Sequence, residues 1–263
     1  WPSTAGEALS RALQHTRPSS AQPPTTRESD AMTRFALGTF DAGDGPFPGI
    51  VIDENIYDIS AFTDYASTDE VLHDWPRAFD RLAAEADAPS TPPTATSSVR
   101  TLPPVARAGQ IYGAGANYRE HVIQMSVAHK LGTEGLSEAE LAEEAARDID
   151  ERKANGEPYV WTGVPSAISG AYDDVVLPAA WDDHDWELEL GVVIGTRAHH
   201  VSVDDALDHG AGYTICNDLT TRSLVPRKDI AMMGTDWMRA KNFPTFYPTG
   251  PWLVPAQFVE DPL

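Results

Sequence analysis

The stretch WELELGVVI (residues 186–194) alternates apolar and acidic residues and then continues as an apolar run. This alternation predicts a β-strand, in which successive side chains point to opposite faces. Glu187 and Glu189 therefore share one face. The other face carries Trp186, Leu188 and Leu190. We expect the apolar face to be buried in a core, with the two glutamates pointing together into the space on the other side.

Two neighbouring carboxylates repel each other unless one is protonated or a cation lies between them. A hard divalent cation with oxygen ligands is the simplest partner, and Asp218, at the end of a second apolar run, could supply a third oxygen. The alternative is a solvated strand face that carries two acids, and residue types alone favour that alternative.

The surrounding sequence, from about Gln110 to Val254, resembles the fumarylacetoacetate hydrolase family. The resemblance rests on four motifs in the family's order and approximate spacing. They are IYGAGANYREH (Ile111 to His121), WELELGVVIG (Trp186 to Gly195), AGYTICNDLTTR (Ala211 to Arg222) and RAKNFPTFYPTGPWLVP (Arg239 to Pro255). Each motif alone would be weak, and the ordered set is specific.

The resemblance implies a β-rich α+β fold, a mixed β-sandwich roll with a small N-terminal β unit. It also implies that Glu187, Glu189 and Asp218 bind Mg²⁺ or Mn²⁺, with Ca²⁺ a further possibility, through their carboxylate oxygens. The expected substrate is a small 2-oxo acid that chelates the ion, so that a metal-chelated enolate forms when a carbon–carbon bond breaks.

By the same resemblance, His121 activates water or moves a proton. Arg222 and Lys241 match family cations that pair with the substrate carboxylate and stabilise oxyanion charge, although a surface salt bridge is an equal alternative for Arg222. Lys241 lies in a largely uncharged stretch, where a lysine without a partner would be costly. Tyr118 and Asn117, in the turn before His121, either contact substrate or hold the loop.

Two positions depart from the pattern of hydrolytic family members. Gln124 replaces a glutamate that forms a water-polarising dyad with the histidine, and Gly163 with Val164 replaces a lysine before the loop at residues 165–170. Glutamine cannot accept a proton. Three functions therefore remain open: a metal-dependent hydrolase of an acylpyruvate-like acid, a dehydratase or isomerase of a 2-oxo acid, and an inert metal-binding or dimerising fragment.

The composition is acidic, with 40 acids against 19 bases and a formal net charge of -21. Such a charge argues against nucleic acid or anionic membrane as a partner. No apolar run is long enough to span a bilayer, and no signal-peptide pattern is present, so we expect a cytoplasmic protein. The single Cys216, in an apolar strand, is expected to be a packed core thiol. Family resemblance implies a homodimer.

We expect disorder over residues 1–31, a small N-terminal domain and linker over 32–100, and the catalytic domain over 101–263. Family members continue beyond the last motif, so this domain is expected to be incomplete at its C-terminus. Patterns predict strands over 33–40, 174–177 and 212–217, a hairpin over 49–60, helices over 69–86 and 137–154, a short helical segment from Ser202, and a linker over 89–98. Ser137 and Glu140 form the expected capping box, and the helix that they open is either a lid or a plain surface insertion.

Overall fold

The computed structural model describes residues 32–262 and divides the chain into two compact units. The first unit combines residues up to 108 with those from 165 onward, and the second spans residues 109–164. This division differs from the predicted one at residue 100, because the N-terminal strands belong to the same sheet as the strand that carries the glutamates. The predicted disorder over residues 1–31 lies outside the described part of the chain.

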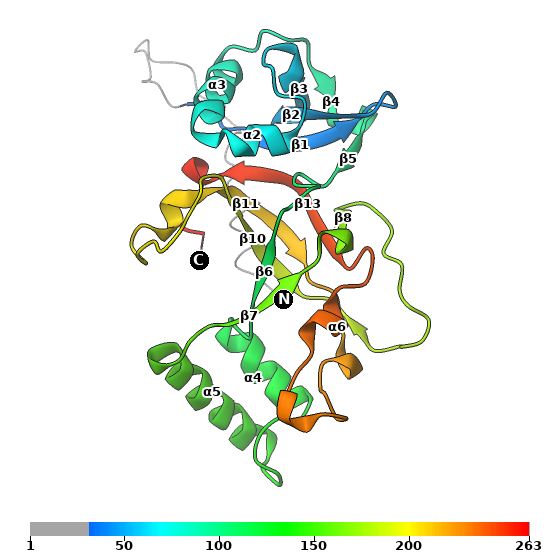
Figure 1. Ribbon diagram of the computed structural model, residues 1–263, viewed down its shortest axis with the longest axis vertical. Helices are drawn as coiled ribbons and strands as arrows, with labels where there is room; N and C mark the ends of the chain where they lie inside the picture. The colour runs from blue at the N-terminus through cyan, green and yellow to red at the C-terminus, as the bar shows by residue number, and fades with distance from the viewer. Residues whose placement is uncertain (1–31, 263) are drawn as a thin grey trace, which may run out of the picture. The chain divides into compact units, whose positions relative to one another are not determined.

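A nine-stranded sheet organises the first unit (Figure 1), and the predicted β-rich α+β fold is confirmed. Seven strands run in the order β10-β11-β13-β1-β2-β3-β4, while β5 pairs with β1 and β8 pairs with β13. The strands are β1 (Ala36–Asp41), β2 (Pro46–Ile52), β3 (Asn55–Asp58), β4 (Thr94–Ala95), β5 (Arg100–Leu102), β8 (Ile168–Gly170), β10 (Leu188–Ile194), β11 (Gly210–Asn217) and β13 (Tyr247–Pro255).

The N-terminal hairpin forms as predicted. Strands β2 and β3 pair antiparallel, with Val51 opposite Ile56, and the turn contains Asp53 at φ 54. Aspartate adopts this left-handed conformation more readily than most residues with a side chain, so a tight turn here is consistent with the sequence. The single pair of Leu37 opposite Leu253 joins this part of the sheet to β13.

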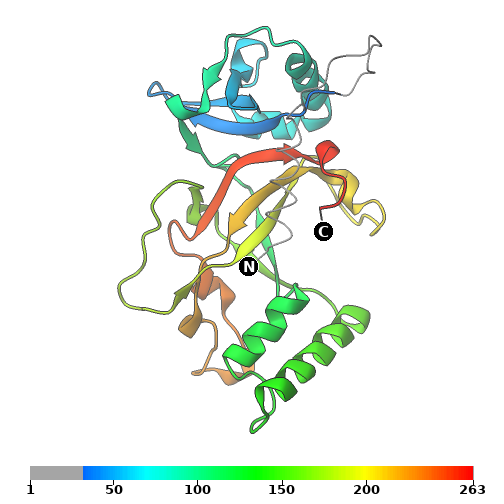
Figure 2. The ribbon, with the colours of Figure 1, turned by 180° about the vertical axis from the view of Figure 1, so that it is seen from behind.

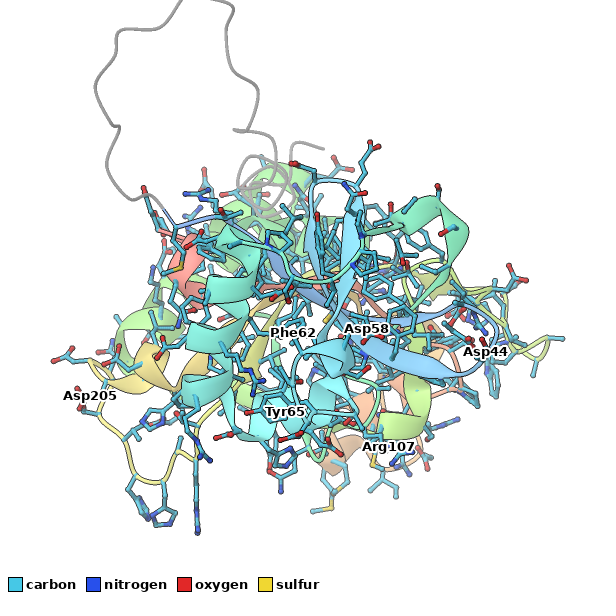
Figure 3. The ribbon with its side chains drawn as sticks, turned by 90° about the horizontal axis from the view of Figure 1, so that it is seen from above. Asp44, Asp58, Phe62, Tyr65, Arg107 and Asp205 are labelled. Carbon is cyan, nitrogen blue, oxygen red and sulfur yellow. The ribbon has the colours of Figure 1, made fainter. Side chains whose placement is uncertain are left out.

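The single helix predicted over residues 69–86 is in fact two, α2 (Thr68–His73) and α3 (Trp75–Asp87). The break falls at Asp74, and Pro76 follows in the first turn of α3, where its missing N–H is tolerated. The Tyr65 hydroxyl donates to Asp74 Oδ2 over 2.7 Å, and Arg81 donates to the carbonyl oxygen of Phe62. Figure 3 labels Phe62 and Tyr65, in the segment before α2.

The main core lies where α2 and α3 pack on the sheet. Trp75, Phe79 and Leu82 from α3 are buried in one cluster with apolar residues of β1, β2, β11 and β13. Gly212 of β11 lies so close to β13 that an added Cβ would be 2.2 Å from the carbonyl oxygen of Val254. Glycine is therefore required there for the two strands to approach.

The prediction for the two faces of the glutamate strand was half wrong. Glu187 is mostly buried, whereas Trp186 is 58% exposed and Leu188 is 37% exposed. Leu190 alone of the predicted apolar set packs against the main core. β10 is an edge strand that pairs with β11 alone among the described strands (Figure 2), and its apolar face is covered only in part.

Two further predictions are corrected. Residues 174–177 form no strand, because the segment makes no ladder with another strand. The linker over 89–98 contains β4 and a 3₁₀ helix (Thr96–Ser98), so its prolines do not prevent a short edge pairing with β3. The helical segment from Ser202 is a 3₁₀ helix at Ala206–His209.

The second unit contains a hairpin and two helices. Strands β6 (Ile111–Gly115) and β7 (Tyr159–Gly163) pair antiparallel, and α4 (Arg119–Ala128) lies beside α5 (Glu138–Asn155) (Figure 1). The predicted capping box of Ser137 and Glu140 is confirmed, and α5 ends before Gly156. Helix α5 has an apolar face despite its polar composition, because it buries Leu141, Ala145 and Ile149.

The first unit also contains several short elements. They are β9 (His184–Asp185), β12 (Thr220–Thr221), α6 (Trp237–Lys241) and 3₁₀ helices at Ile59–Ala61, Pro165–Ala167, Arg222–Leu224, Ala231–Met233 and Ala256–Phe258. Among the helices of residues 32–262, none combines the length and apolar character that a membrane crossing requires.

Candidate active site

The end of the glutamate strand lies against the end of β11. The backbone N–H of Asp218 donates to the carbonyl oxygen of Glu187 over 2.8 Å, and the Glu187 N–H donates to Asn217 Oδ1 over 3.1 Å. These two bonds extend the pairing of β10 and β11 by one step beyond the strands. They bring Glu187 and Asp218 side by side, although the two residues are far apart in the sequence.

Lys241, the last residue of α6, reaches both carboxylates. Its ammonium donates to Glu187 Oε2 over 2.5 Å, to Asp218 Oδ2 and to Thr220 Oγ1 over 2.8 Å. The Lys241 side chain is 2% exposed, so these bonds replace its hydration. Asp236 caps α6 by accepting from the Arg239 N–H, and the Trp237 ring lies 5.3 Å from the ammonium. The expectation that Lys241 has a partner is confirmed.

Arg222 contacts the other carboxylate oxygen of Glu187. Its Nη2 lies 2.6 Å from Glu187 Oε1 and 2.6 Å from Asp185 Oδ2, and its Nε donates to Asp185 Oδ2 over 2.9 Å. The side chain is 19% exposed, so the contact is more buried than the surface salt bridge considered from sequence. Glu187 is thus held by one cation at each oxygen.

Asp185 and Thr220 are site residues that the sequence reasoning missed. Short strands β9 and β12 pair with Thr220 opposite Asp185 and Thr221 opposite His184. His184 supports the pairing through a 2.9 Å contact with Thr221 Oγ1. A signal for Asp185 was available, because it continues the period-two series of Glu187 and Glu189; no sequence signal marks Thr220.

Burial and charge shift the acids in opposite directions. Burial raises the pKa of Asp218 to about 6, against the attraction of Lys241 and with a further increase from Glu187. Burial also acts to raise the pKa of Glu187, but Lys241 and Arg222 together outweigh it, and the net pKa is lowered. The difference follows from the second cation, because Arg222 contacts Glu187 directly.

The donor atoms of this cluster are carboxylate oxygens, the type of ligand that a hard cation binds. Asp218 Oδ1 is buried and has no hydrogen-bond partner among the described residues, so the lone pairs of this oxygen are unused. The contacts above join three carboxylates to two cations, which leaves one negative charge in excess. Glu189, on the same strand face, adds a further acid.

The arrangement differs from the predicted three-ligand site. Within residues 32–262, no three histidine, cysteine, aspartate or glutamate side chains are placed so that they could hold a metal ion. Glu187 and Asp218 come together through the Lys241 ammonium, and Glu189 lies opposite Cys216 in the β10–β11 register. The metal set of Glu187, Glu189 and Asp218 therefore stays a prediction.

Cys216 is a packed thiol, as the sequence indicated. It is 3% exposed, and burial raises its pKa to about 11, partly opposed by hydrogen bonds from Tyr247 and Thr249. A thiol in this state is not a nucleophile at neutral pH. Burial likewise raises the pKa of Tyr247.

The other predicted residues lie in the second unit. His121 is half-buried in the first turn of α4, after Tyr118, the N-cap residue, which is 42% exposed. Asn117 is exposed in the preceding turn. Gln124 follows His121 by one helical turn and is exposed. Gly163 pairs opposite Ile111, where an added Cβ would lie 2.8 Å from the Ile111 side chain, so this tight pairing disfavours the lysine of other family members.

Known proteins with similar sequences include a tautomerase and a hydrolase. The chain is 33% identical over 181 residues to the human mitochondrial oxaloacetate tautomerase, covering 69% of this chain and 48% of that protein. It is 34% identical over 159 residues to a 2,4-didehydro-3-deoxy-L-rhamnonate hydrolase from a Sphingomonas species, covering 60% of this chain and 45% of that one. The chain thus spans about half the length of these relatives.

A solved structure with the same fold is the maleylpyruvate hydrolase from a Sphingobium species, in complex with manganese(II) and pyruvate. The TM-score is 0.61 at 26% identity, over 86% of this chain and 69% of that one. The 2-hydroxyhepta-2,4-diene-1,7-dioate isomerase from Mycobacterium marinum shares the fold, with a TM-score of 0.54 at 22% identity, over 84% of this chain and 66% of that one. The sequence model for the fumarylacetoacetate (FAA) hydrolase C-terminal region matches residues 110–263. The chain therefore belongs to the fumarylacetoacetate hydrolase family.

Proposed function

We propose that the protein is a metal-dependent enzyme that acts on a small 2-oxo acid, with hydrolysis of a carbon–carbon bond of an acylpyruvate as its reaction. The observation that carries the proposal is the buried cluster in which Glu187 and Asp218 converge on one ammonium, with Asp218 Oδ1 lacking a partner. Buried acids that are not all neutralised by protein cations suit a divalent ion and its ligand.

In this proposal Glu187, Glu189 and Asp218 would hold Mg²⁺ or Mn²⁺. When bound, such an ion would supply Lewis-acid chemistry toward the 2-oxo group of the substrate. Arg222 fixes Glu187 against Asp185, so that one ligand oxygen keeps its direction. Lys241 supplies positive charge beside the same oxygens, where negative charge on the substrate would develop.

The similar proteins support the substrate class. Oxaloacetate and maleylpyruvate, named in two of them, are 2-oxo acids, and the maleylpyruvate hydrolase structure holds manganese(II) with pyruvate. Pyruvate carries the adjacent carboxylate and carbonyl oxygens that a hard cation chelates. We propose the same chelation of a hard cation by a 2-oxo acid for this chain.

Calorimetric titration of the full chain with Mn²⁺, with and without oxalate, tests the metal step. Oxalate is a planar mimic of the enolate of a 2-oxo acid. We expect saturable Mn²⁺ binding that oxalate tightens, that Glu187→Ala abolishes and that the matched variant Glu151→Ala, at an exposed glutamate of α5, preserves. A folded chain that binds no Mn²⁺ would refute the assignment.

Tautomerisation or another isomerisation is the second candidate, because Gln124 stands one helical turn after His121 in α4. The amide cannot act as a base on water, whereas proton transfer alone needs no hydrolytic water. Product analysis separates the candidates: an acylpyruvate split into pyruvate and a second acid indicates hydrolysis. Faster enol-to-keto conversion of oxaloacetate without cleavage indicates tautomerisation.

Restoring the carboxylate sharpens this test. Gln124→Glu is expected to raise hydrolysis relative to tautomerisation if the dyad is what the chain lacks, and Gln110→Glu, outside the helix, is the matched control. An inert chain would show neither reaction while it still binds Mn²⁺. We also propose a homodimer, which the family resemblance implies. Sedimentation equilibrium of the full chain tests it.

A further inference from the structure

Lys241 has a geometry that its expected role toward a substrate carboxylate does not explain. Its ammonium is 2% exposed and bridges Glu187 Oε2 and Asp218 Oδ2, the same carboxylates that are expected to hold the metal. An ammonium that contacts both acids this closely occupies the position of a cation between them. The Lys241 ammonium therefore already lies between the two carboxylates, and a metal ion that binds there would have to share them with it.

We infer that Lys241 is an internal counter-ion that competes with the divalent metal for Glu187 and Asp218 and so sets the metal affinity of the site. The inference rests on the metal binding proposed above. It follows from charge: a divalent ion that enters must either displace the ammonium from at least one carboxylate or bind in the presence of its repulsion.

The surroundings of Lys241 offer the ammonium a position without the carboxylates. Thr220 Oγ1 accepts from Nζ over 2.8 Å and itself donates to the carbonyl oxygen of Asp218 over 3.1 Å, so its lone pairs face the ammonium. The Trp237 ring, 5.3 Å from Nζ, adds a cation–π contact. These neutral partners would stabilise a charged lysine that has released an acid oxygen to a metal.

Arg222 is placed differently and does not compete in the same way. It contacts Glu187 through Oε1, the oxygen that Lys241 does not use, and it is anchored by Asp185. Among the described residues its ion pairs are with Asp185 and Glu187, whereas Lys241 pairs with both Glu187 and Asp218. The competition is therefore assigned to Lys241 and not to every cation of the cluster.

The test is calorimetric titration of the full chain with Mn²⁺ alone, which reads affinity without any turnover. Lys241→Met removes the charge while keeping an unbranched side chain, and we expect Mn²⁺ to bind roughly tenfold more tightly or better, because one positive charge a few ångströms from the site is lost. Lys241→Arg keeps the charge and should retain wild-type affinity within about threefold. Equal or weaker binding to Lys241→Met, in a folded variant, would overturn the inference.

Lys241→Gln gives a second test. Glutamine removes the charge but keeps an N–H donor for the two carboxylates, so Mn²⁺ binding should again tighten several-fold, whereas unchanged or weaker binding would overturn the inference even if Lys241→Met fails to fold. The metal site and the role of Lys241 are tested separately. Wild-type binding that Glu187→Ala abolishes decides the metal site, and the order of affinities among Lys241→Met, Lys241→Gln and wild type decides the role of Lys241.

Discussion

The two units each contain ion pairs, but the pairs differ in burial. In the first unit, Lys241 Nζ and Glu187 Oε2 approach within 2.5 Å, with side chains 2% and 9% exposed. In the second, Arg119 Nε and Asp150 Oδ1 of α4 and α5 approach within 2.9 Å, with side chains 48% and 56% exposed. Water screens the exposed pair, whereas the buried pair has to be balanced by protein groups.

The largest expected effect is on the buried cluster. Lys241→Met leaves Glu187 and Asp218 buried with one cation fewer, and it should lower the free energy of unfolding of the first unit by roughly 3–5 kcal/mol in the absence of metal. Urea unfolding in the presence of a chelator measures this. Lys228→Met, at an exposed lysine of the same unit, is the matched control. A loss under 1 kcal/mol would mean that the cluster behaves like a surface pair.

The second unit should be stabilised mainly by its buried apolar side chains, because its Arg119–Asp150 ion pair is exposed. Ile149 is 7% exposed on the face of α5 that it shares with Leu141 and Ala145. Ile149→Ala should cost about 2 kcal/mol, the low end for a buried isoleucine in a small interface. Amide hydrogen exchange within α5 reports this locally, and Glu151→Ala, an exposed position in the same helix, should show no such loss of protection.

The capping box of α5 should contribute less. The Ser137 hydroxyl accepts from the Glu140 N–H, and the Glu140 carboxylate accepts from the Ser137 N–H over 2.8 Å. Ser137→Ala should destabilise α5 by about 1 kcal/mol, because a helix N–H loses its partner. Exchange of the first-turn amides measures the effect. Ser137→Thr keeps the hydroxyl, and a loss as large as that of alanine would contradict the capping explanation.

The smallest effect is expected for the exposed pair. Arg119→Ala should leave the free energy of unfolding nearly unchanged, and any effect should fade in high salt. Arg119 lowers the pKa of Asp150 from its ordinary 3.8. A lowered pKa stabilises the fold at pH values above the unfolded pKa, and the gain disappears as the pH falls below the folded pKa. Wild type and Arg119→Ala should therefore converge in acid, and a salt-independent difference at neutral pH would break the comparison.

The sequence predicted the elements with strong local signals. The capping box at Ser137, the hairpin turn at Asp53 and the apolar strand predicted over 212–217 depend on residues close together in the chain, and each formed. Local signals failed where pairing or burial decides. Residues 174–177 have strand-like composition and no partner strand, and Asp74 with Pro76 divides a helix that periodicity alone reads as continuous.

By itself, the sequence determined the family and the strand that carries Glu189, because these follow from ordered motifs and period-two alternation. Only the tertiary structure decided which face of that strand is buried and which charges meet. Arg222 and Lys241 reach Glu187 from segments that are distant in sequence. Leu188 of this edge strand stays exposed while the Glu187 side chain is mostly buried, because burial depends on which elements cover each face.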